Sequence, residues 1–251
     1  MGIKLEEFLR GKAAALAFSG GTDSALLLAA AAKAGCRVQP YFVHSAFQPG
    51  FELEDAKRLC AQLGVALRVL EASPLEDEQV RANGPLRCYY CKRMIFSALV
   101  SAAAADGFSE VWDGTNASDD AADRPGMRAL AELGVKSPLR LCGLTKADVR
   151  RKSRELGLFT AQKPAYACLA TRVPTGTPLE AETLRRVEAA EGALMAMGFS
   201  NLRVRVLGRL GRLQLPAGQL EEAARRHKDI TGALAPWFDG VLLDLAPRKE
   251  E

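Results

Sequence analysis

The residues best suited to chemistry form a short polar stretch, SGGTDS, at positions 19–24. The apolar run 13–18 before it predicts a buried strand, and the Ala- and Leu-rich run 25–33 after it predicts a helix. Adjacent Gly20 and Gly21 let the backbone turn sharply and bring its N–H groups close to a ligand. The helix adds unpaired N–H groups and a partial positive charge. The stretch therefore predicts an anion site, most simply for phosphate.

The spacing within this stretch distinguishes it from two common phosphate-binding loops. A Walker A loop requires a lysine that is absent here, and a Rossmann fingerprint spaces its glycines differently. The stretch resembles the S-G-G-x-D-S signature of the PP-loop ATP pyrophosphatases, which implies cleavage of ATP to AMP and pyrophosphate. The alternative is a strand–turn–helix joint that carries two glycines and no ligand. The nucleotide-binding residues expected from the resemblance are Ala17, Ser19, Gly20, Gly21, Asp23 and Ser24, with Asp23 also catalytic and helping to hold Mg²⁺.

Composition and net charge narrow the class of protein. The 251 residues are 48% hydrophobic and 25% charged, which is ordinary for a globular protein. No apolar run approaches the ~20 residues that cross a bilayer, and no signal peptide is visible, so we expect a cytoplasmic protein without a membrane partner. The net charge of +4 is too small to indicate a nucleic-acid partner, but it suits a small anionic substrate.

Alternating strands and helices indicate an α/β fold with a parallel sheet. Further strands are expected over 37–44, 65–70 and 110–112, with helices over 54–63 and up to residue 105. Open α/β sheets bind ligands at the carboxyl ends of their strands. His44 after the second strand, and Gly114 and Thr115 after the fourth, are therefore further candidates for the nucleotide site. A loop histidine with no role is the alternative for His44.

A change of composition near residue 165 predicts two domains. Residues 1–165 form the PP-loop domain, and residues 166–251 form a smaller α+β domain. In the second domain we expect helices over 179–197 and 218–229 and strands over 202–207, 212–215 and 240–245. Arg203 and Arg205 alternate along one of these strands, so both point to one face, and arginine suits phosphate and carboxylate groups.

The six cysteines do not indicate a disulfide framework in a chain expected to be cytoplasmic. Cys88 and Cys91 form a C-x-x-C pair, which is common at zinc and iron–sulfur sites, and Cys168 offers a third thiol. A thiolate is also a nucleophile. The remaining three have no partner at ligand spacing and are interpreted as core residues: Cys36, Cys60 and Cys142.

Three further segments together resemble the LarE family of sulfur transferases, and the resemblance covers nearly the whole chain. They are RCYYCK at 87–92, the run 137–158, and KPAYACLATRVPTG at 163–176. The resemblance implies a homo-oligomer that works in making the nickel-pincer nucleotide cofactor. It also implies that ATP adenylates a carboxylate of a pyridinium mononucleotide, after which sulfur displaces AMP and leaves a thiocarboxylate.

The same resemblance assigns Cys168 as the sulfur donor, by either of two routes. A sacrificial cysteine attacks the acyl-adenylate and ends as dehydroalanine. Alternatively, Cys88, Cys91 and Cys168 hold a [4Fe–4S] cluster that carries an extra sulfide. Substrate contacts are implied for Arg172, Arg203 and Arg205, but Gln214 stands where the family has glutamate, which leaves the role of that block open.

Other functions remain as alternatives. A PP-loop tRNA thiolase is expected to show a stronger basic surface, and an NAD- or GMP-synthetase-like amidating enzyme needs an ammonia source, for which no glutaminase segment is present. A non-catalytic adenine-nucleotide sensor would not hydrolyse ATP to AMP.

Overall fold

The computed structural model describes residues 4–119 and 125–248. These residues fall into two compact units. Unit 1 contains residues 4–45, Gly50–Pro74 and the described part of Leu86–Lys163, and unit 2 contains Ala46–Pro49, Leu75–Pro85 and the chain from Pro164. Two short segments from the first half of the sequence therefore belong to the same unit as its last third.

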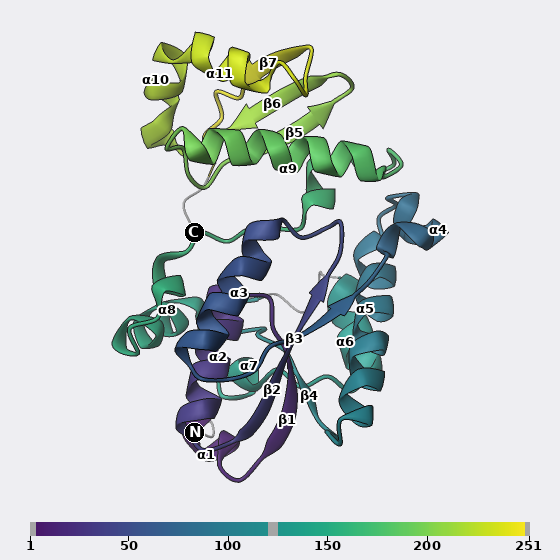
Figure 1. Ribbon diagram of the computed structural model, residues 1–251, viewed down its shortest axis with the longest axis vertical. Helices are drawn as coiled ribbons and strands as arrows, with labels where there is room; N and C mark the ends of the chain where they lie inside the picture. The colour runs from purple at the N-terminus through teal and green to yellow at the C-terminus, as the bar shows by residue number, and fades with distance from the viewer. Residues whose placement is uncertain (1–3, 120–124, 249–251) are drawn as a thin grey trace. The chain divides into compact units, whose positions relative to one another are not determined.

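Unit 1 is built on a sheet of four parallel strands (Figure 1). They are β1 (Ala13–Ala17), β2 (Arg37–His44), β3 (Arg68–Glu71) and β4 (Val111–Trp112), in the order β3-β2-β1-β4. The predicted α/β class is thus confirmed. The chain moves to one side of β1 for β2 and β3 and to the other side for β4. The carboxyl end of β1 is therefore a topological switch point, where open α/β sheets bind ligands.

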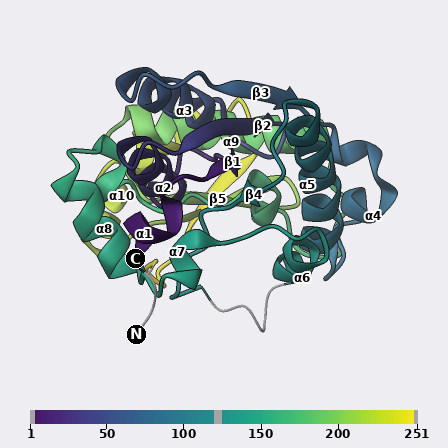
Figure 2. The ribbon, with the colours of Figure 1, turned by 90° about the horizontal axis from the view of Figure 1, so that it is seen from below.

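Alternating residues of β1 face two hydrophobic cores. Ala14 and Leu16 are buried in a core that includes residues of α2 (Thr22–Lys33) and α3 (Gly50–Gln62). Ala15 is buried in the other, with residues of α5 (Arg87–Ala105). Figure 2, which looks at the sheet from below, shows α2 on one side of the strands and α5 on the other. Three shorter helices also lie in the α2 layer: α1 (Leu5–Leu9), α7 (Pro138–Leu141) and α8 (Lys146–Glu155).

Two stretches outside the helices expected above contain further short helices. The region 121–143, whose residues 121–124 lie outside the described chain, includes α6 (Pro125–Glu132) as well as α7. Pro125 does not prevent the helix because proline is tolerated in a first turn, where its missing N–H would have no partner. The polar loop after β3 contains α4 (Glu78–Arg81), whose first turn is capped by the Asp77 carboxylate.

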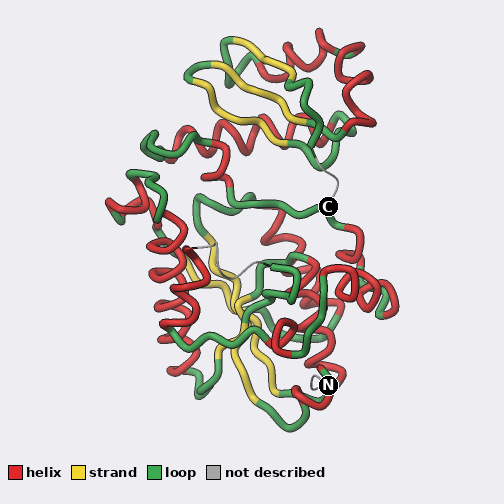
Figure 3. The backbone as a smooth tube through the Cα atoms, turned by 180° about the vertical axis from the view of Figure 1, so that it is seen from behind, coloured by secondary structure: helices red, strands yellow, loops and turns green. Residues whose placement is uncertain are grey.

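Unit 2 contains a three-stranded mixed sheet, seen from behind in Figure 3. Strand β5 (Arg203–Leu207) is antiparallel to β6 (Leu210–Gln214), which is parallel to β7 (Gly240–Leu243). Helices α9 (Ala181–Ala196) and α11 (His227–Leu234) pack against these strands. The predicted α+β character is confirmed, although the single helix expected over 218–229 is divided by Arg226 into α10 (Ala217–Arg225) and α11.

In the described part of the chain, no helix has both the length and the apolar character needed to span a bilayer.

Candidate active site

The glycine-rich loop connects β1 to α2 at the switch point of the sheet. Ser19 at its start and Ser24 in the first turn of the helix have hydroxyl groups 3.2 Å apart, and the Ser24 hydroxyl also lies 3.2 Å from the Gly21 carbonyl oxygen. Gly21 is the N-cap of α2 and forms no side-chain capping bond. The first turn therefore keeps the N–H polarity that attracts anions. Ser19 is exposed, so the loop is open to a ligand.

The loop that follows β4 packs against this first turn. A Cβ atom at Gly114 would lie 2.8 Å from the Ser24 backbone nitrogen, so only glycine allows this close approach. The next residue, Thr115, donates its hydroxyl to the Asp113 carboxylate at 2.5 Å. Because β1 and β4 are parallel neighbours, their carboxyl ends meet at one edge and bring Gly114 and Thr115 to the glycine-rich loop.

Asp23 is held by two residues that the sequence did not single out. Its Oδ2 atom lies 2.5 Å from Lys146 Nζ, and its Oδ1 atom accepts a 3.0 Å hydrogen bond from Asn116 Nδ2. Lys146 is the first residue of α8, and Asn116 is buried after β4. The Asp23 and Lys146 side chains are 24% and 31% exposed, so this ion pair is within reach of a ligand.

Ala17 and His44 lie at the carboxyl edge of the same sheet. Ala17 is the last residue of β1 and is partly buried. The His44 Nδ1 atom is 2.9 Å from the Glu71 carboxylate, and both residues end neighbouring strands β2 and β3. The structure thus places His44 at the predicted edge, in contact with Glu71.

Cys88 and Cys91 lie near the start of α5, where a spacing of three places them on one face. Cys88 is exposed and Cys91 is partly buried. Among the residues that the structure describes, no three or more His, Cys, Asp or Glu side chains are grouped so that they could hold a metal ion. Unit 1 by itself therefore supplies two of the three thiols that the predicted cluster requires, because Cys168 belongs to unit 2.

The other three cysteines lie in or against the first core of unit 1: Cys36, Cys60 and Cys142. Burial raises the pKa of all three thiols, that of Cys60 to about 11. This environment agrees with their interpretation as core residues.

Cys168 immediately precedes a short 3₁₀ helix, Leu169–Arg172. Its carbonyl oxygen accepts hydrogen bonds from the Thr171 hydroxyl at 2.8 Å and from Arg172 Nη1 at 3.2 Å. The following N–H, that of Leu169, donates to the Phe47 carbonyl at 2.9 Å. The peptide that follows this partly buried residue is therefore held at both its C=O and its N–H group.

Arg172 forms a fully buried ion pair with Glu191 of α9. Its Nε and Nη2 atoms lie 2.9 and 3.0 Å from the two carboxylate oxygens, and both side chains are 0% exposed. Burial disfavours the charged form of Arg172, but the hydrogen bond and charge of Glu191 outweigh it and raise the pKa of the guanidinium. Glu191 also accepts bonds from the Tyr166 hydroxyl and the Val204 N–H.

The three predicted substrate arginines all bind backbone carbonyl groups near Cys168. Arg172 donates to Ala167 at 2.6 Å, Arg203 to Ala165 at 2.6 Å, and Arg205 to Thr171 at 2.7 Å. Arg203 is buried, and burial together with the charge of Arg172 lowers its pKa to about 10. Arg205 is only half-buried. The Arg205 Nε atom also donates to Gln214 at 2.6 Å, and Gln214 in turn donates to Asp244 at 2.7 Å.

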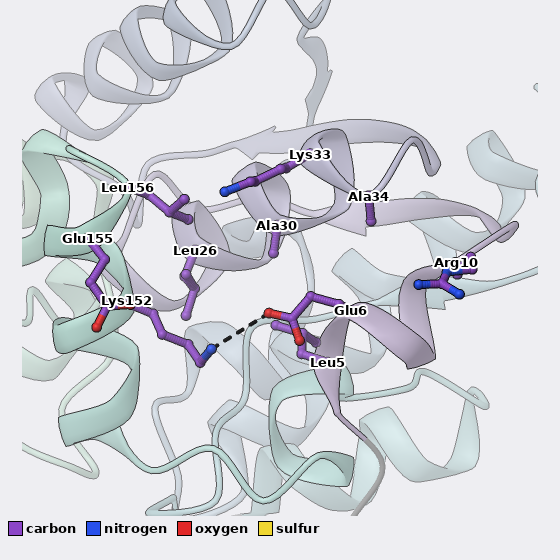
Figure 4. A pocket seen from close by; sticks show the side chains of 10 residues that line it. All are labelled: Leu5, Glu6, Arg10, Leu26, Ala30, Lys33, Ala34, Lys152, Glu155 and Leu156. Carbon is purple, nitrogen blue, oxygen red and sulfur yellow. Dashed lines mark ion pairs between the residues drawn. The ribbon is translucent and has the colours of Figure 1, made fainter.

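A cavity of about 520 Å³ lies beside the other end of α2 (Figure 4). Its apolar lining is formed by Leu5 of α1, three residues of or next to α2, and Leu156 after α8; the three are Leu26, Ala30 and Ala34. The Lys152–Glu6 ion pair of 3.7 Å lies at its edge. None of the predicted site residues lines it. It is thus separate from the glycine-rich loop.

Comparison with known proteins identifies the family. No family model matches the chain. An uncharacterised protein of Synechocystis is 36% identical over 214 residues, which are 83% of this chain and 78% of that protein. The pyridinium-3,5-bisthiocarboxylic acid mononucleotide synthase of Lactiplantibacillus plantarum is 34% identical over 207 residues, 82% of this chain and 75% of the synthase. The chain belongs to the LarE family of sulfur transferases.

A more distant relative supports the PP-loop fold of this LarE-family chain. The 7-cyano-7-deazaguanine synthase of Erythrobacter litoralis, also a PP-loop protein, is 28% identical over 218 residues. The match covers 73% of this chain and 90% of that synthase. The family and the fold predicted from the SGGTDS loop and the segments around Cys88 and Cys168 are therefore confirmed.

Proposed function

We propose that this LarE-family chain uses ATP to convert a carboxylate of a pyridinium mononucleotide into a thiocarboxylate, as a step in making the nickel-pincer nucleotide cofactor. The observation that carries the proposal is the SGGTDS loop at the switch point of the sheet, with Asp23 and Lys146 beside it. The product named for the Lactiplantibacillus relative, a pyridinium bisthiocarboxylic acid mononucleotide, supports the choice of substrate.

The glycine-rich loop would bind the phosphates of ATP. The first turn of α2 has no side-chain cap, so its backbone N–H groups would attract an anion, and the close packing of Gly114 against Ser24 would hold this turn in place. Asp23 would hold Mg²⁺, whose charge would replace that of Lys146 and release the lysine to bind phosphate. The metal would neutralise charge on the departing pyrophosphate. His44 and Ala17 would border the nucleotide at the carboxyl edge of the sheet.

Adenylation makes the substrate reactive. A carboxylate oxygen of the substrate would attack the α-phosphorus of ATP, and the bond to pyrophosphate would break. The product is an acyl-adenylate, in which AMP is a good leaving group. Lys146 and the N–H groups of the loop would stabilise the negative charge that moves to the pyrophosphate oxygens.

Cys168 would then supply the sulfur. Its thiolate attacks the acyl carbon and AMP leaves, which produces a thioester. Removal of the Cys168 α-proton breaks the bond between Cβ and sulfur, so the substrate leaves as a thiocarboxylate and residue 168 becomes dehydroalanine. No oxidant or reductant is required. The hydrogen bonds from Arg172 and Thr171 to the Cys168 carbonyl would keep the thiol in position.

The three arginines would divide their roles. Arg205 is only half-buried and would contact the substrate phosphate, because a guanidinium suits phosphate geometry. Arg172 and Arg203 are buried against Glu191 and backbone carbonyls, so they would act on the substrate by holding the segment 165–171. Where the family has glutamate, this chain has Gln214, which accepts a hydrogen bond from Arg205 and donates one to Asp244. Gln214 and Asp244 together would orient the Arg205 side chain.

The cluster route would need Cys88 and Cys91 in addition to Cys168, and we derive no step through it. Two thiols in one turn of α5 supply half of the ligands of a four-iron cluster. The two routes differ in stoichiometry, because a sacrificial cysteine is consumed and a cluster-bound sulfide is replaced.

The test is a turnover count with the pyridinium biscarboxylic acid mononucleotide, ATP and Mg²⁺. We expect one sulfur transferred per chain, with the loss of one H₂S mapped by peptide mass spectrometry to residue 168. Cys88→Ser and Cys91→Ser should retain this single turnover, and Cys142→Ser is the control for a core thiol. Many turnovers with added sulfide, lost in all of the Cys88, Cys91 and Cys168 variants, would establish the cluster route instead. Transfer by Cys168→Ser would contradict both.

A further inference from the structure

Lys163, the last residue of unit 1, contacts the glycine-rich loop from the side of α3. Its ammonium lies 2.6 Å from Asp55 Oδ2 and 3.4 Å from the Gly20 carbonyl oxygen. It also lies 5.4 Å from the centre of the Phe51 ring. The Lys163 side chain is only 16% exposed, so Asp55 and Phe51 keep its charge beside the loop.

The plane of the peptide between Gly20 and Gly21 is less restricted by side chains than any other peptide of the loop. Neither residue has a Cβ atom, so either orientation of this peptide plane is accessible at low cost. Gly20 has a φ of +70°, and a Cβ there would lie 3.0 Å from the Glu52 carbonyl oxygen, so a side chain cannot be used to fix the orientation. Some other group has to select it.

Lys163 is placed to make that selection, because its ammonium donates to the Gly20 carbonyl oxygen. In a trans peptide the C=O and the following N–H point in opposite directions. When the Gly20 carbonyl faces Lys163, the Gly21 N–H must face the opposite side of the loop. There it donates to the Ser19 hydroxyl oxygen at 3.3 Å, on the side where the Ser19 and Ser24 hydroxyls meet.

We propose that Lys163 is a positioning residue that orients the Gly20–Gly21 peptide and so aims the Gly21 N–H at the phosphates of the nucleotide. The inference rests on the proposed function, because it requires that the loop binds phosphate. With the peptide reversed, the Gly20 carbonyl oxygen would face the phosphates and repel them. Lys163 thus favours phosphate binding without touching the ligand.

The first turn of α2 is anchored by a different contact, which does not involve Lys163. The Thr22 hydroxyl donates a buried 2.9 Å hydrogen bond to the Thr160 carbonyl, which anchors the first turn of α2. Loss of the Lys163 ammonium leaves that bond in place. Replacing Lys163 should therefore spare this anchor and act on the Gly20–Gly21 peptide and on Asp55, which loses its counter-charge.

The experiment measures ligand binding to the full chain by isothermal calorimetry, with inorganic pyrophosphate, ATP and adenosine as separate probes in the presence of Mg²⁺. We expect Lys163→Met to weaken pyrophosphate and ATP by about tenfold, the scale of one hydrogen bond to a charged group, and to leave adenosine unchanged. Lys163→Arg should bind all three like the wild type. Lys57→Met is the matched control, since it removes an exposed lysine from the same helix as Asp55.

A second readout follows the peptide itself. The amide resonance of Gly21 should shift when pyrophosphate is added to the wild type and shift less in Lys163→Met. Wild-type affinity for pyrophosphate and ATP in Lys163→Met, or an equal loss in Lys57→Met, would overturn the inference and leave the proposed function standing. An equal loss for adenosine would show general damage to the site and would also overturn it. Failure of the wild-type protein to bind ATP or pyrophosphate would overturn both.

Discussion

Removing one partner of the buried ion pair between Arg172 and Glu191 should strongly destabilise unit 2. Glu191→Ala removes a carboxylate that receives two bonds from Arg172, one from Tyr166 and one from the Val204 N–H. Both charged side chains are 0% exposed, so the variant leaves the guanidinium buried without a counter-charge. Breaking a buried pair in this way costs about 3–5 kcal/mol. We expect the free energy of unfolding of unit 2 to fall by that amount.

The two tryptophans allow the units to be followed separately, because Trp112 lies in unit 1 and Trp237 in unit 2. Urea unfolding would be recorded by fluorescence in a Trp112→Phe background, so that Trp237 reports on unit 2. The matched control is Glu182→Ala. Its partner Arg185 and Glu182 itself are 70% and 76% exposed, and a surface pair contributes about 0–1 kcal/mol.

A double variant sharpens this experiment. Arg172→Met combined with Glu191→Met removes both charges, and apolar replacement of a whole buried pair is often close to neutral. The double variant should therefore be less destabilised than the sum of the single variants. A loss below about 1 kcal/mol for Glu191→Ala, or strict additivity of the two methionine substitutions, would refute the reasoning.

Three further outcomes follow from the contacts in the site. Gly114→Ala should weaken ATP binding by about tenfold or more, since its Cβ would lie 2.8 Å from the Ser24 nitrogen and push the β4 loop from α2; calorimetry measures this. Exposed Cys88 should be alkylated much faster than Cys60, which is 2% exposed with a pKa raised to about 11; peptide mass spectrometry gives both rates. Hydrogen bonds in the α8 cap, first that from the Thr145 hydroxyl, lower the pKa of Asp148 to about 2. The stability that the ionised carboxylate contributes is therefore present above pH 3.8 and is lost as the pH falls toward 2. The free energy of unfolding of Asp148→Asn should depend less on pH in that window than that of the wild type.

Local patterns were sufficient to predict the sheet and the glycine-rich loop. The apolar run before residue 19 and the helix formers after residue 24 each act over a few neighbouring positions. The rule that ligands meet strand ends also located Gly114, which the structure places against Ser24. These features depend on backbone geometry that a short sequence determines.

The partners of Asp23 could not be predicted, because they depend on pairings across distant positions. Asn116 and Lys146 are 93 and 123 residues away in sequence, and each lies in a polar segment with several equivalent candidates. The polar loop after β3 shows the same limit. Asn83 is buried in unit 2, where its side-chain amide donates to the Pro174 carbonyl at 2.9 Å.

For the two arginines of β5, the alternation of side chains along a strand predicts their direction but not their burial. Alternation indicates that Arg203 and Arg205 share a face, but it does not show how deeply each is buried. In the structure Arg203 donates to the Ala165 carbonyl, whereas Arg205 donates to Thr171 and Gln214. The sequence therefore indicated that both arginines share a face, but not that Arg203 is buried and Arg205 only half-buried.

The central claim is that ATP is used to adenylate a carboxylate of the substrate. It is tested most directly by giving the wild-type protein a pyridinium biscarboxylic acid mononucleotide whose carboxylate oxygens carry a heavy isotope, together with ATP and Mg²⁺. Because the attacking oxygen stays on phosphorus when sulfur displaces AMP, the account predicts labelled AMP, unlabelled pyrophosphate and a thiocarboxylate product. Formation of ADP with the label in inorganic phosphate, or of AMP without label, would contradict it.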